Sequence, residues 1–284
     1  MRFGPWDVQI ISAGTFALDG GAMFGTVPKV VWSKVYPCDA DNQITMATNC
    51  LLIRGEVDGR RHVILVDNGN GDKEDDAFMA RFKFEGRGIL DRELAKHGVK
   101  PEDVTLQILT HLHFDHAGGS TRLDAAGELV PSFPNARYVV QQQDLADAKH
   151  PHLRVKASYL AKNWEPLEAA GLLDVVDGHA EILPGITVDL APGHIEGLQT
   201  VTIEGGGRKL VYLADLIPTA RHIQPAWVMG YDLDVVACVD NRIKLLDQVT
   251  GTGTVLVFEH DPEIPAGTVS RDAKGRYAVT PVAI

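Results

Sequence analysis

Three histidines and an aspartate lie within six residues of one another, as His111, His113, Asp115 and His116. They follow residues 105–109, an apolar stretch that predicts a short strand. On an extended segment, His111 and His113 project to one side and can share a cation, while Asp115 and His116 can bind a second ion. Without a cation, the clustered side chains would repel one another when charged and lack hydrogen-bond partners when neutral. The cluster therefore predicts a metal centre.

Further ligands are expected on other loops, because one loop cannot fill two coordination spheres. His194, Asp215 and His260 each end or follow a β-rich stretch, where a ligand on a strand-terminal loop would lie. Imidazole and carboxylate donors without thiolates suit zinc, and also iron, manganese or cobalt. The sequence thus predicts two divalent metal ions, with zinc as the first choice.

The pattern of the remaining residues predicts a mixed α/β sandwich with helices outside. Strands are expected at residues 8–16, 48–55, 62–67, 105–109, 137–140, 186–190, 199–204, 209–214 and 254–258. Helices are expected at residues 74–84, 89–97, 144–149, 153–163 and 233–249. No linker rich in Ser, Pro or Gly divides the chain, so residues 1–284 are expected to form one domain.

Composition excludes several partners. With 27 basic and 38 acidic residues, the net charge of −11 argues against binding to nucleic acid or to an anionic membrane. The 3 cysteines form no CxxC pair and are expected to be buried apolar residues in a reducing compartment. Residues 1–7 lack the apolar segment of a signal peptide, so a cytoplasmic location is expected.

The HxHxDH motif and the three later ligands, in this order, resemble the metallo-β-lactamase superfamily over nearly the whole chain. The resemblance implies a single-domain αββα sandwich with a dinuclear metal centre at one edge. The resemblance implies that one metal is held by His111, His113 and His194. It implies that the other is held by Asp115, His116 and His260, and that Asp215 bridges both.

Within the superfamily, the sequence resembles the quorum-quenching N-acyl-homoserine lactonase branch, with methyl-parathion-hydrolase-like enzymes nearby. The resemblance rests on Asp215, on residues 17–29 and 32–34 of the N-terminal loop, and on residues 163–166. It implies a lactone or ester as the small-molecule substrate. It also implies a homodimer, with residues 18–29 as a contact.

The expected mechanism follows from two ions about 3.5–4 Å apart that share a hydroxide, because coordination lowers the pKa of water toward 7. This bridging hydroxide would attack the carbonyl of a lactone or ester, with one ion polarising the carbonyl oxygen and the other stabilising the leaving alkoxide. Asp115 and Asp215 are the catalytic candidates. For Asp115, metal ligation ranks above proton transfer, since a bound carboxylate has a low pKa.

The substrate pocket shows one departure from the lactonase pattern. Pro218 stands where many of these lactonases carry a tyrosine, so Tyr231 or His222 is expected to take over its role at the substrate carbonyl, if any residue does. Several apolar and aromatic residues in loops are candidates for lining the pocket, although contacts in the core or across a dimer would explain their presence equally well. The candidate pocket residues are Met23, Phe24, Trp227, Met229, Tyr231 and His222.

Asp67, at the end of a predicted strand, is expected either to form a turn or to support a ligand from behind.

Among rival functions, an organophosphate triesterase or a general carboxylesterase could use the same site. This chain has no basic cluster near the C-terminus to hold glutathione, which disfavours a thioesterase of the glyoxalase II kind, and its acidic charge disfavours a nuclease. The non-enzyme alternative is a catalytically silent metal-binding sensor.

Overall fold

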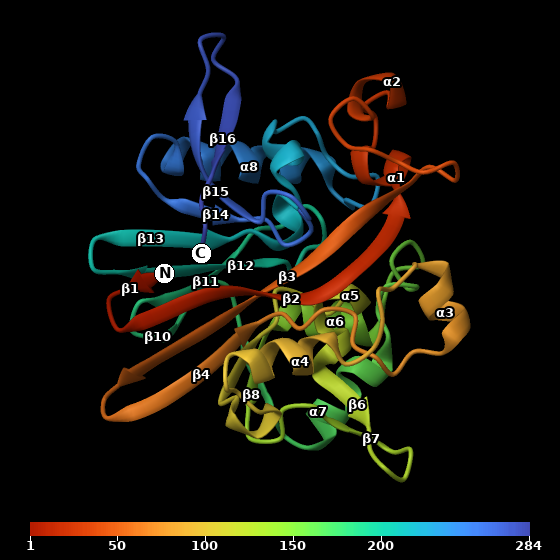
Figure 1. Ribbon diagram of the computed structural model, residues 1–284, viewed down its shortest axis with the longest axis vertical. Helices are drawn as coiled ribbons and strands as arrows, with labels where there is room; N and C mark the ends of the chain where they lie inside the picture. The colour runs from red at the N-terminus through yellow and green to blue at the C-terminus, as the bar shows by residue number, and fades with distance from the viewer.

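A computed structural model describes residues 1–284 as two seven-stranded β-sheets packed against each other, with helices on their outer faces (Figure 1). The strands of the first sheet are, in spatial order, β1 (Arg2–Phe3), β2 (Trp6–Asp19), β3 (Gln43–Val57), β4 (Arg60–Val66), β5 (Leu106–Ile108), β8 (Arg137–Gln141) and β9 (Leu173–Val176). Those of the second are β10 (Ala180–Leu183), β11 (Ile186–Leu190), β12 (Gln199–Gly205), β13 (Arg208–Tyr212), β14 (Val255–Val257), β15 (Ala266–Arg271) and β16 (Tyr277–Pro281). A separate hairpin pairs β6 (Thr121–Leu123) with β7 (Leu129–Pro131).

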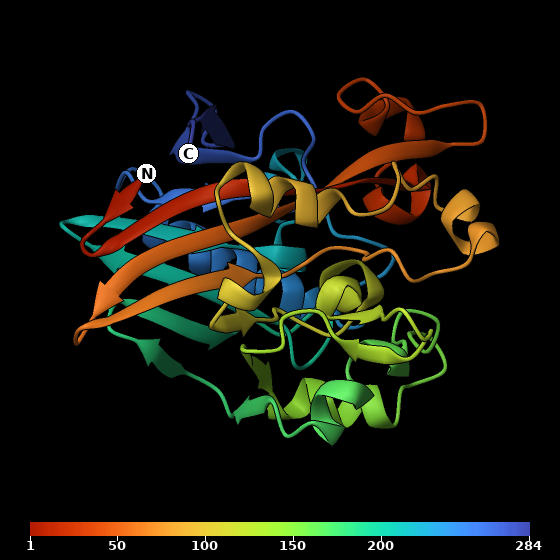
Figure 2. The ribbon, with the colours of Figure 1, turned by 60° about the horizontal axis from the view of Figure 1, so that its bottom comes forward.

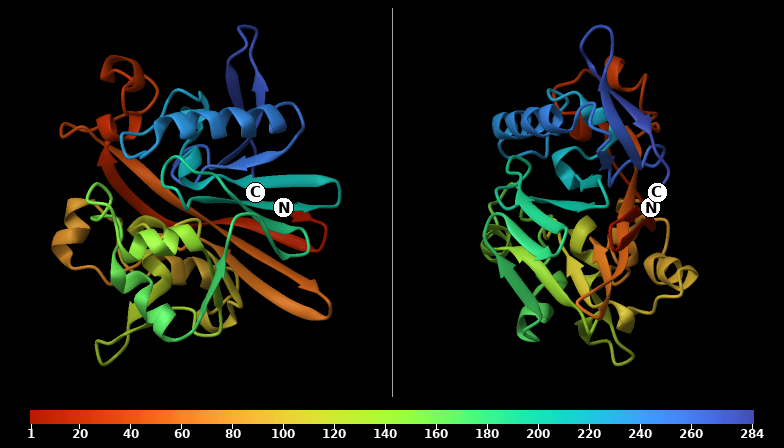
Figure 3. Two further views of the ribbon diagram at one scale, coloured as in Figure 1. Left: turned by 180° about the vertical axis from the view of Figure 1, so that it is seen from behind. Right: turned by 90° about the vertical axis from the view of Figure 1, so that its left-hand side faces the viewer.

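Eight α-helices complete the fold. They are α1 (Gly20–Phe24), α2 (Lys29–Trp32), α3 (Asp76–Arg81), α4 (Ile89–Lys96), α5 (Phe114–Ala117), α6 (Gln142–Lys149), α7 (Glu165–Ala169) and α8 (Val235–Val249). Helix α4 lies against β2 on the first sheet (Figure 2), and α8 runs along the second sheet (Figure 3). None of the helices combines the length and the apolar character that a membrane span requires.

One apolar core lies between the two sheets and joins them. In β3, the consecutive residues Cys50, Leu51, Leu52 and Ile53 are all buried. Such a run without polar alternation is typical of a strand that is covered on both faces. The same cluster of buried side chains continues through the second sheet, for example at Leu256 in β14. This packing holds the ends of the two sheets in a fixed relation.

Parallel pairing brings the carboxyl ends of several strands to one edge of the sandwich. In the first sheet β4 pairs parallel with β5, and in the second sheet β13 pairs parallel with β14. Strand β11 runs in the same direction as β13, because both are antiparallel to β12. Loops that follow these strands therefore meet at one place, as loops after the carboxyl ends of strands do in open α/β sheets.

The predicted strands correspond to strands of the structure, but several other elements differ. Strands β2 and β3 are longer than expected, with 14 and 15 residues. Strands β9, β10 and the β15–β16 hairpin were not expected from the sequence. Residues 153–163, predicted as a helix, form turns that end in a short 3-10 helix, Ala161–Asn163. Their conformation follows contacts with the segment that carries the HxHxDH motif instead, because the Phe114 amide donates to the Ser158 carbonyl at 2.9 Å.

Close backbone packing fixes the loop that follows the HxHxDH motif. A Cβ added at Gly118 would lie 2.2 Å from the carbonyl oxygen of Asn70, and one at Gly71 would lie 2.3 Å from the carbonyl oxygen of Gly118. Both neighbours are backbone atoms, which cannot move aside cheaply. The two glycines thus let the loop after β4 pack directly on the end of α5.

We expect Gly118→Ala to lower the free energy of unfolding by about 1–3 kcal/mol, the usual cost of overpacking. Its φ of −61° suits alanine, so the cost comes from the clash alone. The control is Gly207→Ala, at φ 74° with open space around it, which should cost about 1 kcal/mol through backbone strain. Urea unfolding measures both variants. A Gly118→Ala variant as stable as the wild type would contradict the packing argument.

Candidate metal centre

The HxHxDH motif begins as extended backbone and ends in a helix. After β5 the chain bends at Thr110, and His113, in an extended conformation, precedes the short helix α5 that carries Asp115 and His116. The rings of His111 and His113 lie 4.5 Å apart between centroids, and those of His111 and His116 lie 3.9 Å apart. The motif therefore gathers its side chains at one point, as the sequence predicts.

The other three predicted ligands reach the same point from the second sheet. His194 lies between β11 and β12, Asp215 follows β13, and His260 follows β14. All three are buried, with exposed fractions of 2–6%. The structure thus brings together all seven side chains that the sequence singles out.

The seven side chains divide into overlapping groups that could each hold a metal ion. Within each group, the potential ligand atoms lie within 4.8 Å of one another. The groups are His111 with His113 and His194, Asp115 with His116 and His260, and His111 with His116 and Asp215.

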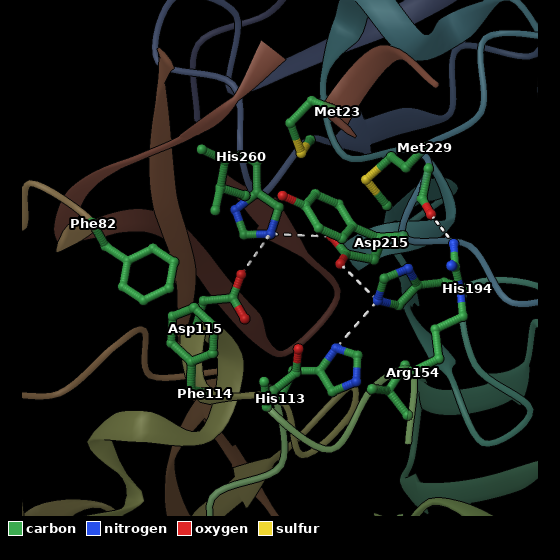
Figure 4. Close-up of a pocket in the computed structure, with 16 residues that line it drawn as sticks. Met23, Phe82, His113, Phe114, Asp115, Arg154, His194, Asp215, Met229 and His260 are labelled. Carbon is green, nitrogen blue, oxygen red and sulfur yellow. Dashed lines mark hydrogen bonds and ion pairs between the residues drawn. The ribbon is translucent and has the colours of Figure 1, made fainter. Parts of the chain in front are cut away.

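Asp215 lies between the two halves of the cluster. Its Oδ2 is 3.1 Å from Nε2 of His194, and its Oδ1 is 3.1 Å from Nε2 of His260 (Figure 4). One carboxylate therefore reaches an imidazole from each half, as a bridging ligand requires.

Buried polar atoms in the cluster lack protein partners. Nε2 of His111, Nε2 of His113 and Oδ1 of Asp215 are buried without a hydrogen bond. Elsewhere nitrogen faces nitrogen, as Nδ1 of His113 and Nε2 of His194 do at 3.2 Å. Buried polar groups are normally satisfied, so these unpartnered atoms fit divalent cations as their missing partners.

Electrostatics separates the imidazoles into two kinds. Burial, together with the neighbouring imidazoles, lowers the pKa values of His111 and His113 well below their ordinary value. Burial also opposes charge on His260, but Asp215 outweighs it and raises the pKa of His260 to about 9. Burial opposes ionisation of Asp215, yet the surrounding histidines hold its pKa well below the ordinary value. The carboxylate is ionised and ready to bind a cation.

Buried acids hold the rings of two predicted ligands, His116 and His194, from behind. Asp67 accepts hydrogen bonds from the amide and hydroxyl of Thr110 at 2.7 and 2.6 Å and from Nδ1 of His116 at 3.0 Å. Asp232 accepts one from Nδ1 of His194 at 3.1 Å. Such partners fix the orientation of a ligand ring and leave Nε2 free for the metal. Of the two interpretations of Asp67, the structure gives it contact with a ligand.

Sequence reasoning missed two of these supporting acids. Glu259 is fully buried beside His260, and its Oε2 is 2.9 Å from Nδ1 of His116. Burial raises the pKa of Glu259 to about 8, against the opposing effect of His116. Its position next to a predicted ligand was a usable signal. Asp232 gives no such signal, because it lies 38 residues from the histidine that it contacts.

A cavity of about 470 Å³ opens over the cluster (Figure 4). Five of the predicted ligands line it: His113, Asp115, His194, Asp215 and His260. Its apolar lining residues include Leu18, Met23, Phe82, Phe114 and Met229. A small molecule can thus reach the cluster along an apolar wall.

The predicted pocket residues divide into two sets. Met23, Met229 and Tyr231 line the cavity, whereas Phe24, Trp227 and His222 do not. Phe24 stacks on His222 with ring centroids 4.6 Å apart, and Trp227 packs edge-on against Phe24. These three lie behind the cavity wall, because stacking between their rings draws them into a separate cluster. The expectation that they line the pocket is corrected accordingly.

Comparison with known proteins agrees with this fold. A sequence model described as the metallo-beta-lactamase superfamily matches residues 45–260. An N-acyl homoserine lactonase from Bacillus cereus is 28% identical over 177 residues, which cover 61% of this chain and 62% of that protein. The match therefore spans less than two thirds of the relative's length.

Two solved structures cover the whole chain. A probable metal-dependent hydrolase from Staphylococcus aureus is 31% identical, with a TM-score of 0.88 and full coverage of both chains. AidC, a dizinc quorum-quenching lactonase solved in complex with a product, is 25% identical, with a TM-score of 0.78, and the match covers 100% of this chain and 97% of AidC. The expected fold class is confirmed.

We expect zinc to raise the melting temperature of chelator-treated protein, because a ligand that binds only the folded state stabilises it. At a free zinc concentration 100 times Kd, the free energy of unfolding rises by about 2.7 kcal/mol. His113→Ala and Asp215→Ala should lose both the bound zinc and this gain.

Thermal unfolding and elemental analysis measure the two effects. The control is His179→Ala, whose exposed ring lies 2.8 Å from Asp189 on the surface. Wild-type zinc content in His113→Ala or Asp215→Ala would contradict the assignment of the ligands.

Proposed function

Because the chain belongs to the metallo-beta-lactamase superfamily, we propose that it is a metal-dependent hydrolase that opens N-acyl homoserine lactones and so quenches quorum signals. The observation that carries the proposal is the position of Asp215, within 3.1 Å of one imidazole from each half of the cluster and on the wall of the cavity. The relatives that are named as lactonases support this choice of substrate.

We propose that the seven clustered side chains hold two divalent ions, with zinc as the first candidate. His111, His113 and His194 would hold one ion and Asp115, His116 and His260 the other, with Asp215 shared between them. Such ions supply activation of water as a nucleophile near neutral pH and polarisation of a carbonyl oxygen.

The protein's own groups then position the reaction. Asp67 and Asp232 hold the rings of His116 and His194, so that their Nε2 atoms point into the centre. Asp115 lines the cavity and its Oδ2 lies 3.8 Å from Nε2 of His260. A carboxylate oxygen of Asp115 that is not bound to a cation would be placed to take the proton that the attacking water gives up and to pass it to the leaving oxygen of the opened ring.

The shape and lining of the cavity suit an amphiphilic substrate. A volume of about 470 Å³ lies within the range of small-molecule sites. The polar end holds the clustered ligands, and Leu18, Met23, Phe82 and Phe114 form an apolar side. A lactone ring at the cluster would leave its acyl chain to pack along these apolar residues.

Tyr231 is the candidate for the role of the tyrosine that Pro218 replaces. Both ring nitrogens of His222 are occupied, at 2.7 Å from Oγ1 of Thr219 and 2.9 Å from the carbonyl of Met23. The hydroxyl of Tyr231 has no partner in the chain, and burial raises its pKa to about 12. It therefore stays protonated at neutral pH and is free to donate a hydrogen bond to a substrate carbonyl.

We expect the zinc-loaded protein to hydrolyse N-hexanoyl homoserine lactone faster than a paraoxon-type triester or a simple carboxylic ester. A pH-indicator assay follows the acid that ring opening releases, and chelation should abolish the rate. A higher kcat/KM on the triester would identify a phosphotriesterase instead. Silence toward lactones, esters and triesters would leave the sensor as the remaining function.

We expect Tyr231→Phe to lower kcat/KM for the lactone by about tenfold or more, the cost of removing one donor to a developing oxyanion. Zinc content should not change, because the tyrosine is not a ligand. Tyr277→Phe is the control, since this tyrosine lies on β16 away from the cavity. Unchanged kinetics in Tyr231→Phe would remove the residue from the mechanism.

A further inference from the structure

Arg154 is the only lysine or arginine among the residues that line the cavity. It lies in the turn segment between α6 and Tyr159, in the stretch that the sequence predicts as a helix. Figure 4 shows its side chain running along the side of His194 toward the segment that contains Met229. This places a positive charge beside the reacting end of the cavity.

A short segment of the opposite wall holds one edge of the guanidinium in place. Nη2 of Arg154 donates to the carbonyl of Gly230. The amide of Gly230 donates to the carbonyl of Ala22 at 2.7 Å, and the amide of Met229 donates to Asp232 at 2.9 Å. The carbonyl that Arg154 contacts therefore lies on a segment that is fixed at both sides, and the exposed guanidinium makes this one contact with it.

The remaining donors of Arg154 have no partner in the chain. Nε and Nη1 make no hydrogen bond, and no carboxylate lies within 4.0 Å of the group. Some other arginines are paired, as Arg87 is with Asp76 at 2.9 Å and Arg271 is with Asp247 at 3.1 Å. Exposed arginines such as Arg60 and Arg81 have no carboxylate partner either, but unlike Arg154 they do not line the cavity. In a chain with 38 acidic and 27 basic residues, an unpaired guanidinium on a cavity wall is available for an oxygen acceptor of a ligand.

The same segment supplies a second free donor. Ser158 lines the cavity, and its hydroxyl makes no hydrogen bond within the chain. Leu18 and Phe82 line the cavity with apolar surface. The cavity therefore offers polar donors from residues 154–158 besides the apolar surface that an acyl chain needs.

We propose that Arg154 is a specificity-determining residue that binds carbonyl oxygens in the acyl part of the substrate. This inference rests on the proposed lactonase function. A guanidinium presents parallel N–H groups in a planar fork. The amide oxygen and a keto oxygen at carbon 3 of the acyl chain can lie on the same side and accept from two such N–H groups. The preferred substrates are thus 3-oxoacyl homoserine lactones.

The test compares N-(3-oxohexanoyl) with N-hexanoyl homoserine lactone, which differ by one oxygen, on the zinc-loaded protein. A hydrogen bond to a charged group corresponds to about tenfold or more in kcat/KM, so the wild type should prefer the oxo substrate by that factor. Arg154→Gln should bring the ratio close to one, mainly through KM. Arg154→Lys should give an intermediate ratio, because it keeps the charge but loses the fork.

Lys156→Gln is the matched control, because Lys156 is exposed on the same segment and does not line the cavity. It should keep the wild-type ratio, and zinc content should be equal in all variants. Two results would overturn the proposal: a wild-type ratio near one, or an Arg154→Gln variant that slows both substrates by the same factor. The second result would mean that Arg154 only supports the segment around Gly230 and does not select the substrate.

If the protein is not a lactonase, the results differ from those expected when only the role of Arg154 is wrong. If neither lactone is hydrolysed, calorimetric titration with the two ring-opened N-acyl homoserines still tests Arg154. Tighter binding of the 3-oxo compound that is lost in Arg154→Gln would support the role of Arg154 without the activity. Equal binding of both compounds to the wild type would overturn it.

Discussion

The need for positive charge within a cluster of buried imidazoles and carboxylates is the constraint on which the rest of the structure depends. Five histidines and two aspartates meet in a space where nitrogen faces nitrogen at 3.2 Å and buried atoms lack partners. No protein group satisfies these atoms, and the seven side chains are at most 8% exposed. Divalent cations would turn these unsatisfied contacts into ligand bonds, and metal binding would then stabilise the folded state.

The sandwich gathers the clustered side chains through the direction of its strands, and buried acids behind the rings hold them in orientation. Parallel pairing sets the carboxyl ends of β4, β5, β13 and β14 at one edge, where their loops carry most of the ligands. Asp67 and Asp232 then fix the rings of His116 and His194 from the far side, and Glu259 lies beside His116. The same two sheets leave a cavity above the cluster, and part of its wall comes from segments outside the seven clustered residues, such as Leu18, Met23 and Arg154. Chemistry and substrate choice can therefore vary separately on this fold.

Local pattern was enough to predict the seven clustered residues, because each one lies in the motif or at the end of a β-rich stretch. Their roles as ligands remain a proposal. The fold class was predictable for the same reason, through strand periodicity and the resemblance. Asp232, Arg154 and the turns at residues 153–163 were not, since their positions depend on contacts with distant segments such as His194 and Gly230. Likewise, only the three-dimensional stacking of Phe24 on His222 distinguishes these two from Tyr231, which does line the cavity.

The central claim is that one buried cluster holds two ions with Asp215 shared between them. Anomalous diffraction at the zinc absorption edge, from crystals of the zinc-loaded protein, tests this most directly. The account predicts two separate peaks, one beside His113 and His194 and one beside His116 and His260, with Asp215 in contact with both. A single peak, or two peaks of which Asp215 touches only one, would contradict it.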